Sequence, residues 1–337
     1  MISQMRDQIT DKIKKFSIEL GFDLIKIIPA HAKPSEKRRL KKWLSLGKNA
    51  DMEWMKNNSD LRADPDKILP GAKSIICLAT NYFNSVEPRL HEDSVKIARY
   101  AWSKNYHKII EKRLKYFEEF IKKLAPKAKI KRYVDTGPFL ERYFASQAGL
   151  GFIGKNNCLI TREFGSFVFL AEIITDLALS PDETFRRFAS QSSRSSSISP
   201  STSAAACFSS TSLPPSPSCG TCTRCIDACP TGALKPHNLD ARKCISYLTI
   251  ESKKPFPKSI RAKIKPWIFG CDACQNACPH NVRATPTKNP DFALAAPLRT
   301  LTLSQLRTIK TEDEFKNLLA GTSLIRAKFK GMKRNIK

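Results

Sequence analysis

The sequence has no run of eighteen or more apolar residues, and its N-terminus carries no apolar signal segment. A membrane-spanning helix and a secretory signal both need such a run, so we expect neither, and no membrane partner. The expected location is therefore the cytoplasm, where thiols stay reduced. Eleven cysteines in that compartment indicate metal binding rather than disulfides.

Acidic residues are scarce, with 31 Asp and Glu against 58 Lys and Arg, for a net charge of +27. The cysteine pattern described below predicts two iron–sulfur clusters, each held by four thiolates and carrying a charge of about −2. With both in place the net charge would still be about +23. This surplus points to a polyanionic partner, nucleic acid first, although a basic surface without a specific partner has the same composition. The length of 337 residues allows two domains, or one domain with an added module.

Eight of the cysteines form a pattern typical of iron–sulfur proteins. One run reads C-x2-C-x2-C-x3-C followed by Pro230, a second reads C-x2-C-x3-C followed by Pro279, and one cysteine stands between them. Three thiolates at such gaps can surround one [4Fe–4S] cluster, while the fourth cysteine of a run ligates the other cluster. The predicted crossed ligand sets are Cys219, Cys222, Cys225 and Cys278 for one cluster, and Cys229, Cys244, Cys271 and Cys274 for the other. Structural zinc is the alternative, but zinc sites rarely use three cysteines at consecutive two-residue gaps.

Three cysteines lie outside this pattern. Cys77 sits in an apolar run and Cys158 opens an expected strand, so both are interpreted as small core residues. Cys207 lies in the stretch 184–217, where Ser, Pro, Ala and Thr dominate without an apolar period. That composition predicts a flexible linker.

Apolar periodicity predicts helices over residues 4–19 and 105–124, and strands over 23–28, 74–79 and 131–134. A basic helix is expected over residues 33–42, before Trp43. Residues 158–161 and 166–175 are expected to form a hairpin that closes the first domain.

Asp135 follows the third of these strands and precedes an expected helix over 139–148. Aspartate is a preferred N-cap, and Pro138 suits a first helical turn, so a capping role is one interpretation. A catalytic carboxyl group at the tip of a strand is the other, and the residues alone leave both open.

A glycine-rich segment, residues 149–156, matches G-x-G-x-x-G and nearly matches a P-loop. Both motifs need a preceding strand, whereas here a helix is expected, and a P-loop needs Ser or Thr where Asn156 stands. We therefore expect a loop that passes close to another bulky ligand. Basic residues also gather between Cys244 and Trp267, where they could contact RNA or an acidic redox partner; they are Lys253, Lys254, Lys258, Arg261, Lys263 and Lys265.

Taken together, the strings CGTCTRCIDACPTGAL from Cys219, CISYLT from Cys244 and GCDACQ from Gly270 resemble epoxyqueuosine reductases. The motifs RYA from Arg99, YHK from Tyr106, VDTG from Val134 and the Gly-Phe and Lys-Asn pairs of the glycine-rich segment share the resemblance. It covers nearly the whole chain apart from residues 184–217, where the family has a much shorter connection.

The resemblance implies an α+β fold in which a cobalamin-binding, reductive-dehalogenase-like domain precedes a bacterial-ferredoxin-like domain with two [4Fe–4S] clusters. The implied divisions are a catalytic domain at 1–180, a linker at 181–217, a cluster domain at 218–290 and a basic helical C-terminal tail at 291–337. It also implies the activity: reduction of the epoxide of epoxyqueuosine at the tRNA wobble position through cob(I)alamin fed by the clusters. The implied partners are a tRNA and an external electron donor, and the protein is expected to be a monomer.

The resemblance makes Asp135 the expected proton donor, in a site that is partly buried. It further implies cobalamin contacts at Arg62, Ala98, Asp135, Leu159, Thr161, Leu170, Ser246 and Asp272. Two alternatives are weighed against it: a reductive dehalogenase-like enzyme for a small molecule, which leaves the basic charge unexplained, and a ferredoxin-type electron carrier, which needs no ligand site in its first domain.

Overall fold

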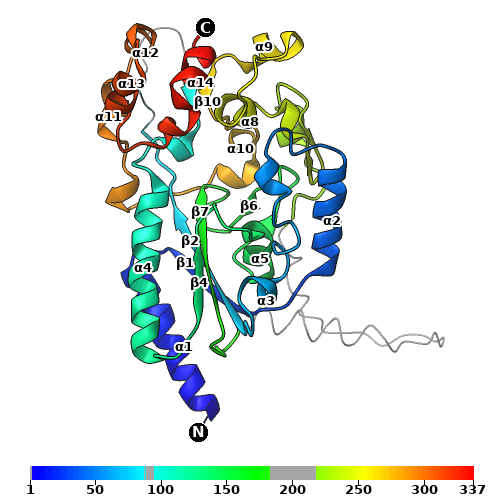
Figure 1. The fold of residues 1–337 in the computed structure, drawn as a ribbon, viewed down its shortest axis with the longest axis vertical. Coiled ribbons are helices and arrows are strands. Elements are labelled where there is room, and N and C mark those ends of the chain that lie inside the picture. The colour runs from blue at the N-terminus through cyan, green and yellow to red at the C-terminus, as the bar shows by residue number, and fades with distance from the viewer. Residues whose placement is uncertain (1, 87, 89–94, 183–217) are drawn as a thin grey trace, which may run out of the picture.

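A computed structural model of the chain describes residues 2–86, 88, 95–182 and 218–337 (Figure 1). The predicted linker lies outside the described residues from residue 183 onward. Just before that point, Asp182 is fixed against the first strand, where its carboxylate accepts the N–H of Ile27 at 2.8 Å. None of the helices described here is long and apolar enough to cross a membrane.

Most of the helices are short, and the four longest strands, of four to eight residues, build one sheet. The helices are α1 (Ile2–Glu19), α2 (Pro34–Ser45), α3 (Pro65–Ile68), α4 (Tyr106–Leu124), α5 (Glu141–Gln147), α7 (Arg224–Asp227), α8 (Ile245–Ile250), α9 (Lys258–Ile264), α10 (Ala273–Asn276), α11 (Ala296–Thr300), α12 (Leu303–Thr308), α13 (Glu312–Leu318) and α14 (Lys328–Asn335). The strands are β1 (Leu24–Pro29), β2 (Ser74–Asn81), β3 (Lys96–Ile97), β4 (Ile130–Tyr133), β5 (Phe152–Ile153), β6 (Leu159–Ile160), β7 (Val168–Thr175), β8 (Leu234–Lys235), β9 (Asn238–Leu239) and β10 (Trp267–Phe269).

A four-stranded antiparallel sheet with the order β1-β2-β7-β4 organises the first part of the chain. Every residue of β2 is buried, as expected for a central strand covered on both faces. Alternate side chains of each strand point to opposite faces. On one face Ile76 and Phe169 pack with α1 and α4, and on the other Ile75 and Ile174 pack with α5. Figure 1 shows α1 and α4 on one side of the sheet and α5 on the other.

The cysteine region, residues 218–281, contains helices of four to seven residues and strands of two or three. It is attached to the sheet region through buried polar contacts. Asn281 accepts the N–H of Ser166 at 2.7 Å, and the Trp43 indole N–H donates to the carbonyl of Leu239 at 2.7 Å. Strand β10 also pairs in parallel with β3 from the first part of the chain.

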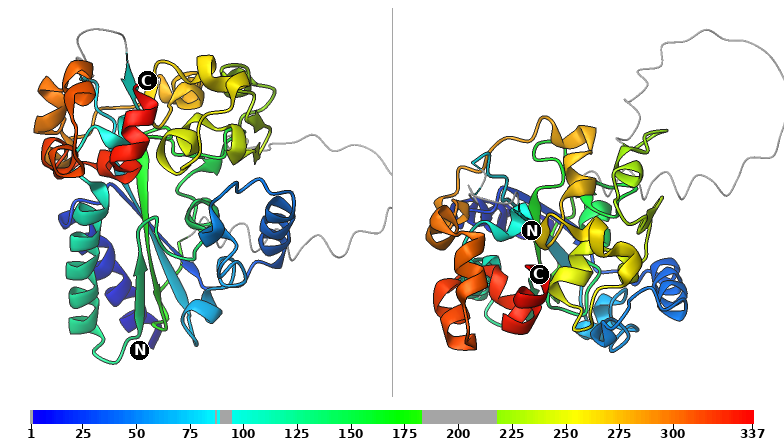
Figure 2. Two further views of the ribbon diagram at one scale, coloured as in Figure 1. Left: turned by 45° about the horizontal axis from the view of Figure 1, so that its top comes forward. Right: turned by 90° about the horizontal axis from the view of Figure 1, so that it is seen from above.

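Residues 291–337, expected as a basic helical tail, do form helices, but their apolar side chains enter a shared core. Leu298, Phe315 and Met332 are buried with Ile97 of β3 and Phe269 of β10. This segment is therefore an integral part of the fold, because its apolar positions face inward and Arg334 donates to the carbonyls of Ser252, Lys254 and Leu248. Figure 2 shows these helices, coloured orange to red, beside the yellow cysteine region at one end of the sheet.

Most predicted elements are confirmed, including α1, α2, α4 and the strands of the sheet. The predicted hairpin of residues 158–161 and 166–175 is wrong. Strand β7 is paired with β2 and β4 on its two edges, so β6 pairs instead with β5, and only an isolated bridge joins Thr161 to Gly165. Gly151 permits this pairing, because a Cβ there would lie 2.2 Å from the carbonyl oxygen of Ile160.

Candidate active site

The main cavity lies between the end of the sheet and the cysteine region, and contains about 1560 Å³ of empty space, part of it open to solvent. One wall comes from the sheet region and includes Tyr106, Asp135 and Leu170. The other comes from the cysteine region and includes Ser246 and Asp272. A ligand in this cavity would therefore touch both parts of the chain.

Four thiols line a smaller cavity with about 290 Å³ of empty space. They are the first thiol set, Cys219, Cys222, Cys225 and Cys278. Although distant in sequence, the loops before α7 and after α10 bring them together. Burial raises the pKa of Cys225 and of Cys278, so these thiols need a cationic centre to become thiolates.

The second thiol set, Cys229, Cys244, Cys271 and Cys274, lines the main cavity. Burial raises the pKa of Cys271 to about 12, and also raises the pKa of Cys244 and of Cys274. Within the described residues, no three His, Cys, Asp or Glu side chains converge tightly enough to hold a single metal ion. Each set instead surrounds a space, a geometry that suits a multi-iron cluster.

Asp135 does not cap a helix, so the capping interpretation is wrong. The N-cap of α5 is Leu140, whereas Asp135 stands in the preceding loop with φ +59°, a left-handed conformation uncommon for a residue with a side chain. Its carboxylate accepts the Tyr106 hydroxyl at 2.6 Å and lies 3.6 Å from His107 Nε2. The side chain is 60% exposed, so the expectation of partial burial is also wrong.

The groups around Asp135 are held in defined protonation states. Burial, then the charge of Asp135, raises the pKa of Tyr106, so its hydroxyl stays protonated and donates. Burial lowers the pKa of His107, which favours a neutral ring despite the nearby carboxylate. The Tyr106 ring stacks on Phe169 with centroids 4.1 Å apart, which fixes the direction of its hydroxyl.

Of the eight predicted cobalamin contacts, six line the main cavity: Ala98, Asp135, Leu159, Leu170, Ser246 and Asp272. The other two do not. Arg62 is buried, and its guanidinium donates to the carbonyls of Gly137 and Trp54, so it braces the loop that carries Asp135. Thr161 is buried and its hydroxyl donates to the carbonyl of Gly165 at 3.0 Å.

The glycine-rich segment passes between the two cavities. Asn156 lines both of them and is 5% exposed, and its side-chain Nδ2 has no hydrogen-bond partner among the residues that the structure describes. Lys155 donates its backbone N–H to Cys219 Sγ at 3.4 Å and its Nζ to the carbonyl of Gly220 at 2.7 Å. A buried donor without a partner indicates that a ligand acceptor belongs there.

Sequence reasoning missed several residues of the cavity. Cys77 is a core residue as predicted, but Cys158 lines the main cavity and is not a core residue. Glu141 also lines it and was not singled out, whereas Asn156, which lines it too, belongs to the glycine-rich segment that was expected to pass close to a bulky ligand. Glu172 lies behind this wall, fully buried in β7. The one signal for it was a single acidic residue in the apolar string FVFLAEII.

Two family models match the chain. The model described as "Epoxyqueuosine reductase QueG, DUF1730" matches residues 62–136, and the model described as "4Fe-4S double cluster binding domain" matches residues 218–281. The second match favours iron–sulfur clusters over zinc.

Relatives match nearly the full chain. An epoxyqueuosine reductase of Leadbetterella byssophila is 38% identical over 98% of both chains, and that of Escherichia coli K12 is 33% identical over 95% of this chain and 77% of its own. A crystal structure of epoxyqueuosine reductase with an epoxyqueuosine-modified tRNA-Tyr stem loop matches with a TM-score of 0.80, 30% identity and coverage of 98% and 80%. A Bacillus subtilis epoxyqueuosine reductase, with its catalytic aspartate loop swung out of the active site, matches with a TM-score of 0.79, 29% identity and the same coverage. This similarity favours an epoxyqueuosine reductase over the two alternatives.

Proposed function

The chain belongs to the epoxyqueuosine reductase family of oxidoreductases, and from this premise we propose that it reduces the epoxide of epoxyqueuosine in a tRNA anticodon loop to give queuosine. The supporting observation is the main cavity, with the Asp135 carboxyl group on one wall and four thiols on the other. Reductive removal of an epoxide oxygen to leave an alkene takes two electrons at the ring and two protons for the oxygen, which departs as water. The two walls carry groups suited to these two tasks.

The chain has a double-cluster domain, and we assign one [4Fe–4S] cluster to each thiol set. The second set borders the main cavity, so its cluster would deliver electrons there. The first set lies in the smaller cavity, where Cys219 and Cys222 are partly exposed, and its cluster would receive electrons from an external donor. The two clusters would therefore act in series.

Cobalamin is the proposed ligand of the main cavity. The size of the cavity, its mixed polar and apolar lining and the unpartnered Asn156 amide all fit a large ligand with many amide groups. When bound, cobalamin supplies a reduced, strongly nucleophilic cobalt centre. Leu159 and Leu170 would pack against its ring system, while Ser246 and Asp272 would contact its polar edge.

Asp135 is the proposed proton donor. Its exposed carboxyl group points into the cavity, oriented by the Tyr106 hydroxyl, and can reach a substrate entering from solvent. The corresponding aspartate loop of the Bacillus subtilis relative can swing out of the active site. We propose that the loop around Asp135 closes on the substrate in the same way.

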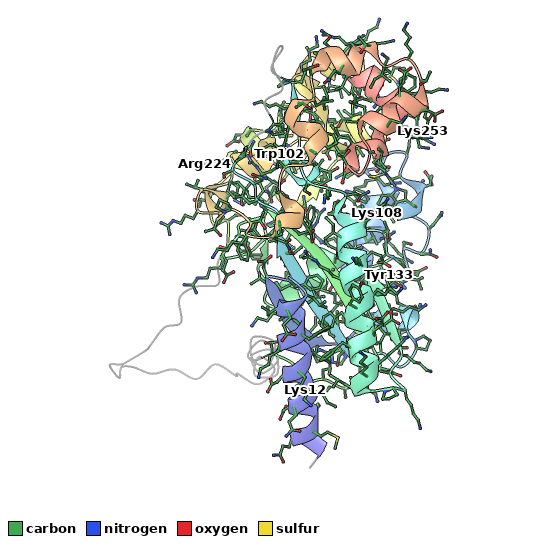
Figure 3. The ribbon with its side chains drawn as sticks, turned by 90° about the vertical axis from the view of Figure 1, so that its left-hand side faces the viewer. Lys12, Trp102, Lys108, Tyr133, Arg224 and Lys253 are labelled. Atoms are coloured by element: carbon green, nitrogen blue, oxygen red, sulfur yellow. The ribbon has the colours of Figure 1, made fainter. Side chains whose placement is uncertain are left out.

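The basic residues on and before α9 would contact the tRNA backbone. Lys253 lies at the end of the molecule that holds the cysteine region, far from Lys12 on α1 (Figure 3). A positive surface near the cavity would attract the phosphates of an anticodon stem loop.

The test is an anaerobic assay of epoxyqueuosine reduction on tRNA, using cluster-reconstituted protein with and without added cobalamin. We expect queuosine only when cobalamin and a low-potential reductant are both present, with a cobalamin absorption spectrum that remains with the protein after gel filtration. Turnover without cobalamin would contradict the cofactor assignment. Cobalamin retention without any reduction of the epoxide would contradict the proposed substrate.

A further inference from the structure

Glu172 stands out among the buried residues of the sheet. It is 0% exposed, and neither of its carboxylate oxygens receives a hydrogen bond from any donor among the described residues. Its neighbours across the strands are Cys77 in β2 and Tyr133 in β4, which point to the same face. An ionised carboxylate in such surroundings is strongly disfavoured.

The partner of Glu172 is a second carboxyl group. The carboxyl group of Glu141, the first residue of α5, lies beside that of Glu172, and each raises or lowers the pKa of the other. Two carboxylates cannot hydrogen-bond to each other unless one of them carries a proton, and a protonated carboxyl that donates to a carboxylate forms a strong hydrogen bond. Burial raises the pKa of both groups, that of Glu141 to about 8, so the pair holds a proton at neutral pH.

Glu141 links this pair to the loop of Asp135. Its Oε1 accepts the backbone N–H of Asp135 at 2.5 Å, in the residue whose φ is +59°. That backbone conformation is costly for a side-chain-bearing residue, so contacts around it must hold it. The nearby bond from Arg62 to Gly137 supports the far side of the same loop.

We propose that Glu172 and Glu141 form a proton-sharing latch that holds Asp135 in its working conformation. Protonated Glu172 donates to Glu141, which in turn keeps its acceptor oxygen directed at the N–H of Asp135. Both glutamates are positioning residues that act through the loop: Glu172 is fully buried, and Glu141, although it lines the main cavity, acts through its bond to the N–H of Asp135. The inference rests on the proposed function in one respect only, namely that Asp135 is the proton donor of the reaction.

The pair lies among few other charges. The titratable and charged groups that face it are Asp135 in the loop, Arg62, Arg142 in α5, Cys77 in β2, Tyr133 in β4 and Tyr106 in α4. Since folding raises the carboxyl pKa values, the folded state binds more protons than the unfolded chain between about pH 4.5 and about pH 8. Stability should therefore fall as the pH rises through this range.

Two substitutions of similar size separate the latch from simple packing. Glu172→Gln keeps a donor for Glu141, whereas Glu172→Leu fills the same space without one. We expect amide exchange in the segment containing Asp135 to be roughly tenfold faster in Glu172→Leu, the usual effect of losing one hydrogen bond to a charged group, and within about twofold of wild type in Glu172→Gln. Turnover should follow the same order through kcat, with KM unchanged.

An infrared carbonyl band of a protonated carboxylic acid should be present at pH 7 and should lose the intensity that Glu172 contributes in Glu172→Gln. The fall in stability between about pH 4.5 and about pH 8 should weaken in the same variant. If wild type lacks the band, or if the two variants exchange alike at Asp135, the latch is refuted. If Glu172→Leu does not fold, Glu141→Ala replaces it in the experiment. Faster amide exchange at Asp135, with the amides of β7 still protected, supports the latch. Unchanged amide exchange at Asp135 refutes it.

These measurements need no tRNA and no cobalamin. A wild-type protein with the acid band and the expected exchange pattern, but no activity on epoxyqueuosine, would refute the proposed function and leave the latch standing. A wild-type protein that reduces epoxyqueuosine but lacks the acid band would refute the latch and leave the proposed function standing.

Discussion

The wall that carries Asp135 is built on eight-residue strands, whereas the wall that carries the second thiol set is built on helices of four to six residues. In the sheet wall, Ile76 and Phe117 are fully buried in one continuous core. In the cysteine wall, α10 buries no apolar side chain, and α8 contributes Ile245 and Leu248 to a smaller core with Trp267. The large core can hold the first wall without help, while the second wall, with its smaller core, depends more on bonds to its ligands.

This difference in support gives the two walls different roles at the cavity. A wall held by its own core can orient Tyr106 and Asp135 before any cofactor binds, since stacking on Phe169 fixes the tyrosine. A wall held by thiolate bonds is completed only when its clusters are inserted. Substitutions on the first wall should therefore change the chemistry at constant iron content, and substitutions on the second should change both.

The largest effect is expected from Cys244→Ala. Removing one ligand should cost the cluster beside the cavity, so iron should fall from about eight to about four per chain, and turnover should be lost because electrons no longer reach the cavity. Cys158→Ala is the matched control, since Cys158 lines the same cavity but belongs to neither set. Iron analysis and electron paramagnetic resonance would report the result. Unchanged iron in Cys244→Ala would overturn the crossed assignment.

Asp135→Asn should lower turnover by about 10²–10⁴-fold, the usual contribution of a general acid, because an amide cannot supply the proton. Asn can still accept the Tyr106 hydroxyl, so the fold, the clusters and cobalamin retention should be unchanged. Single-turnover reduction of epoxyqueuosine in tRNA would measure the rate. A variant that works at nearly the wild-type rate would remove Asp135 from the mechanism and leave the cysteine wall as the sole source of chemistry.

Replacing Lys253, Lys254 and Lys258 together with Gln should weaken tRNA binding without changing the clusters. If each lysine neutralises one phosphate, the slope of log K against log salt should fall by up to about 2.7. Lys254 also pairs with Asp51 at 3.0 Å, but this pair is exposed and adds little stability.

A matched control removes the same charge from the other end of the molecule. Lys12, Lys15 and Lys123 lie on the exposed faces of α1 and α4. Lys12 stands far from Lys253 (Figure 3). Their replacement should leave the salt slope unchanged. Equal weakening by both triple variants would mean that net charge, and not a surface beside the cavity, attracts the tRNA.

Local patterns were sufficient to predict the regular elements. The apolar spacing of residues 110–121 predicted α4, and the run from Ser74 predicted β2, because each pattern reflects the face that an element buries. The pairing of β6 with β5 could not be predicted in this way. It depends on a close approach at Gly151 and on β2 and β4 already occupying both edges of β7, which are properties of the assembled sheet.

The candidate site was predictable where its ligands follow a regular spacing in the sequence. The gaps of the cysteine runs suggested two ligand sets before any geometry was known, and those sets line two separate cavities. Glu141 carried no such signal, since an isolated polar residue beside a loop is usually solvated, whereas Asn156 belongs to the glycine-rich segment that was expected to pass close to a ligand. Glu172 did carry a signal, because a buried acidic residue inside an apolar strand needs either a proton or a charged partner.

The smallest effect is expected from Asn105→Ala at the start of α4. Asn105 caps this helix by accepting the N–H of His107 at 3.1 Å, and losing such a cap costs about 1 kcal/mol. Asn105→Asp should cap about equally well and remain near wild-type stability.

Because the cap belongs to the sheet wall, the thermal unfolding temperature of Asn105→Ala should shift while its iron content stays constant. The cap also precedes Tyr106, which the stack on Phe169 holds independently, so turnover at 25 °C should stay within about twofold. A loss of turnover larger than the loss of stability would show that the sheet wall is less rigid than its core suggests, and that the cap helps to hold Tyr106 against Asp135.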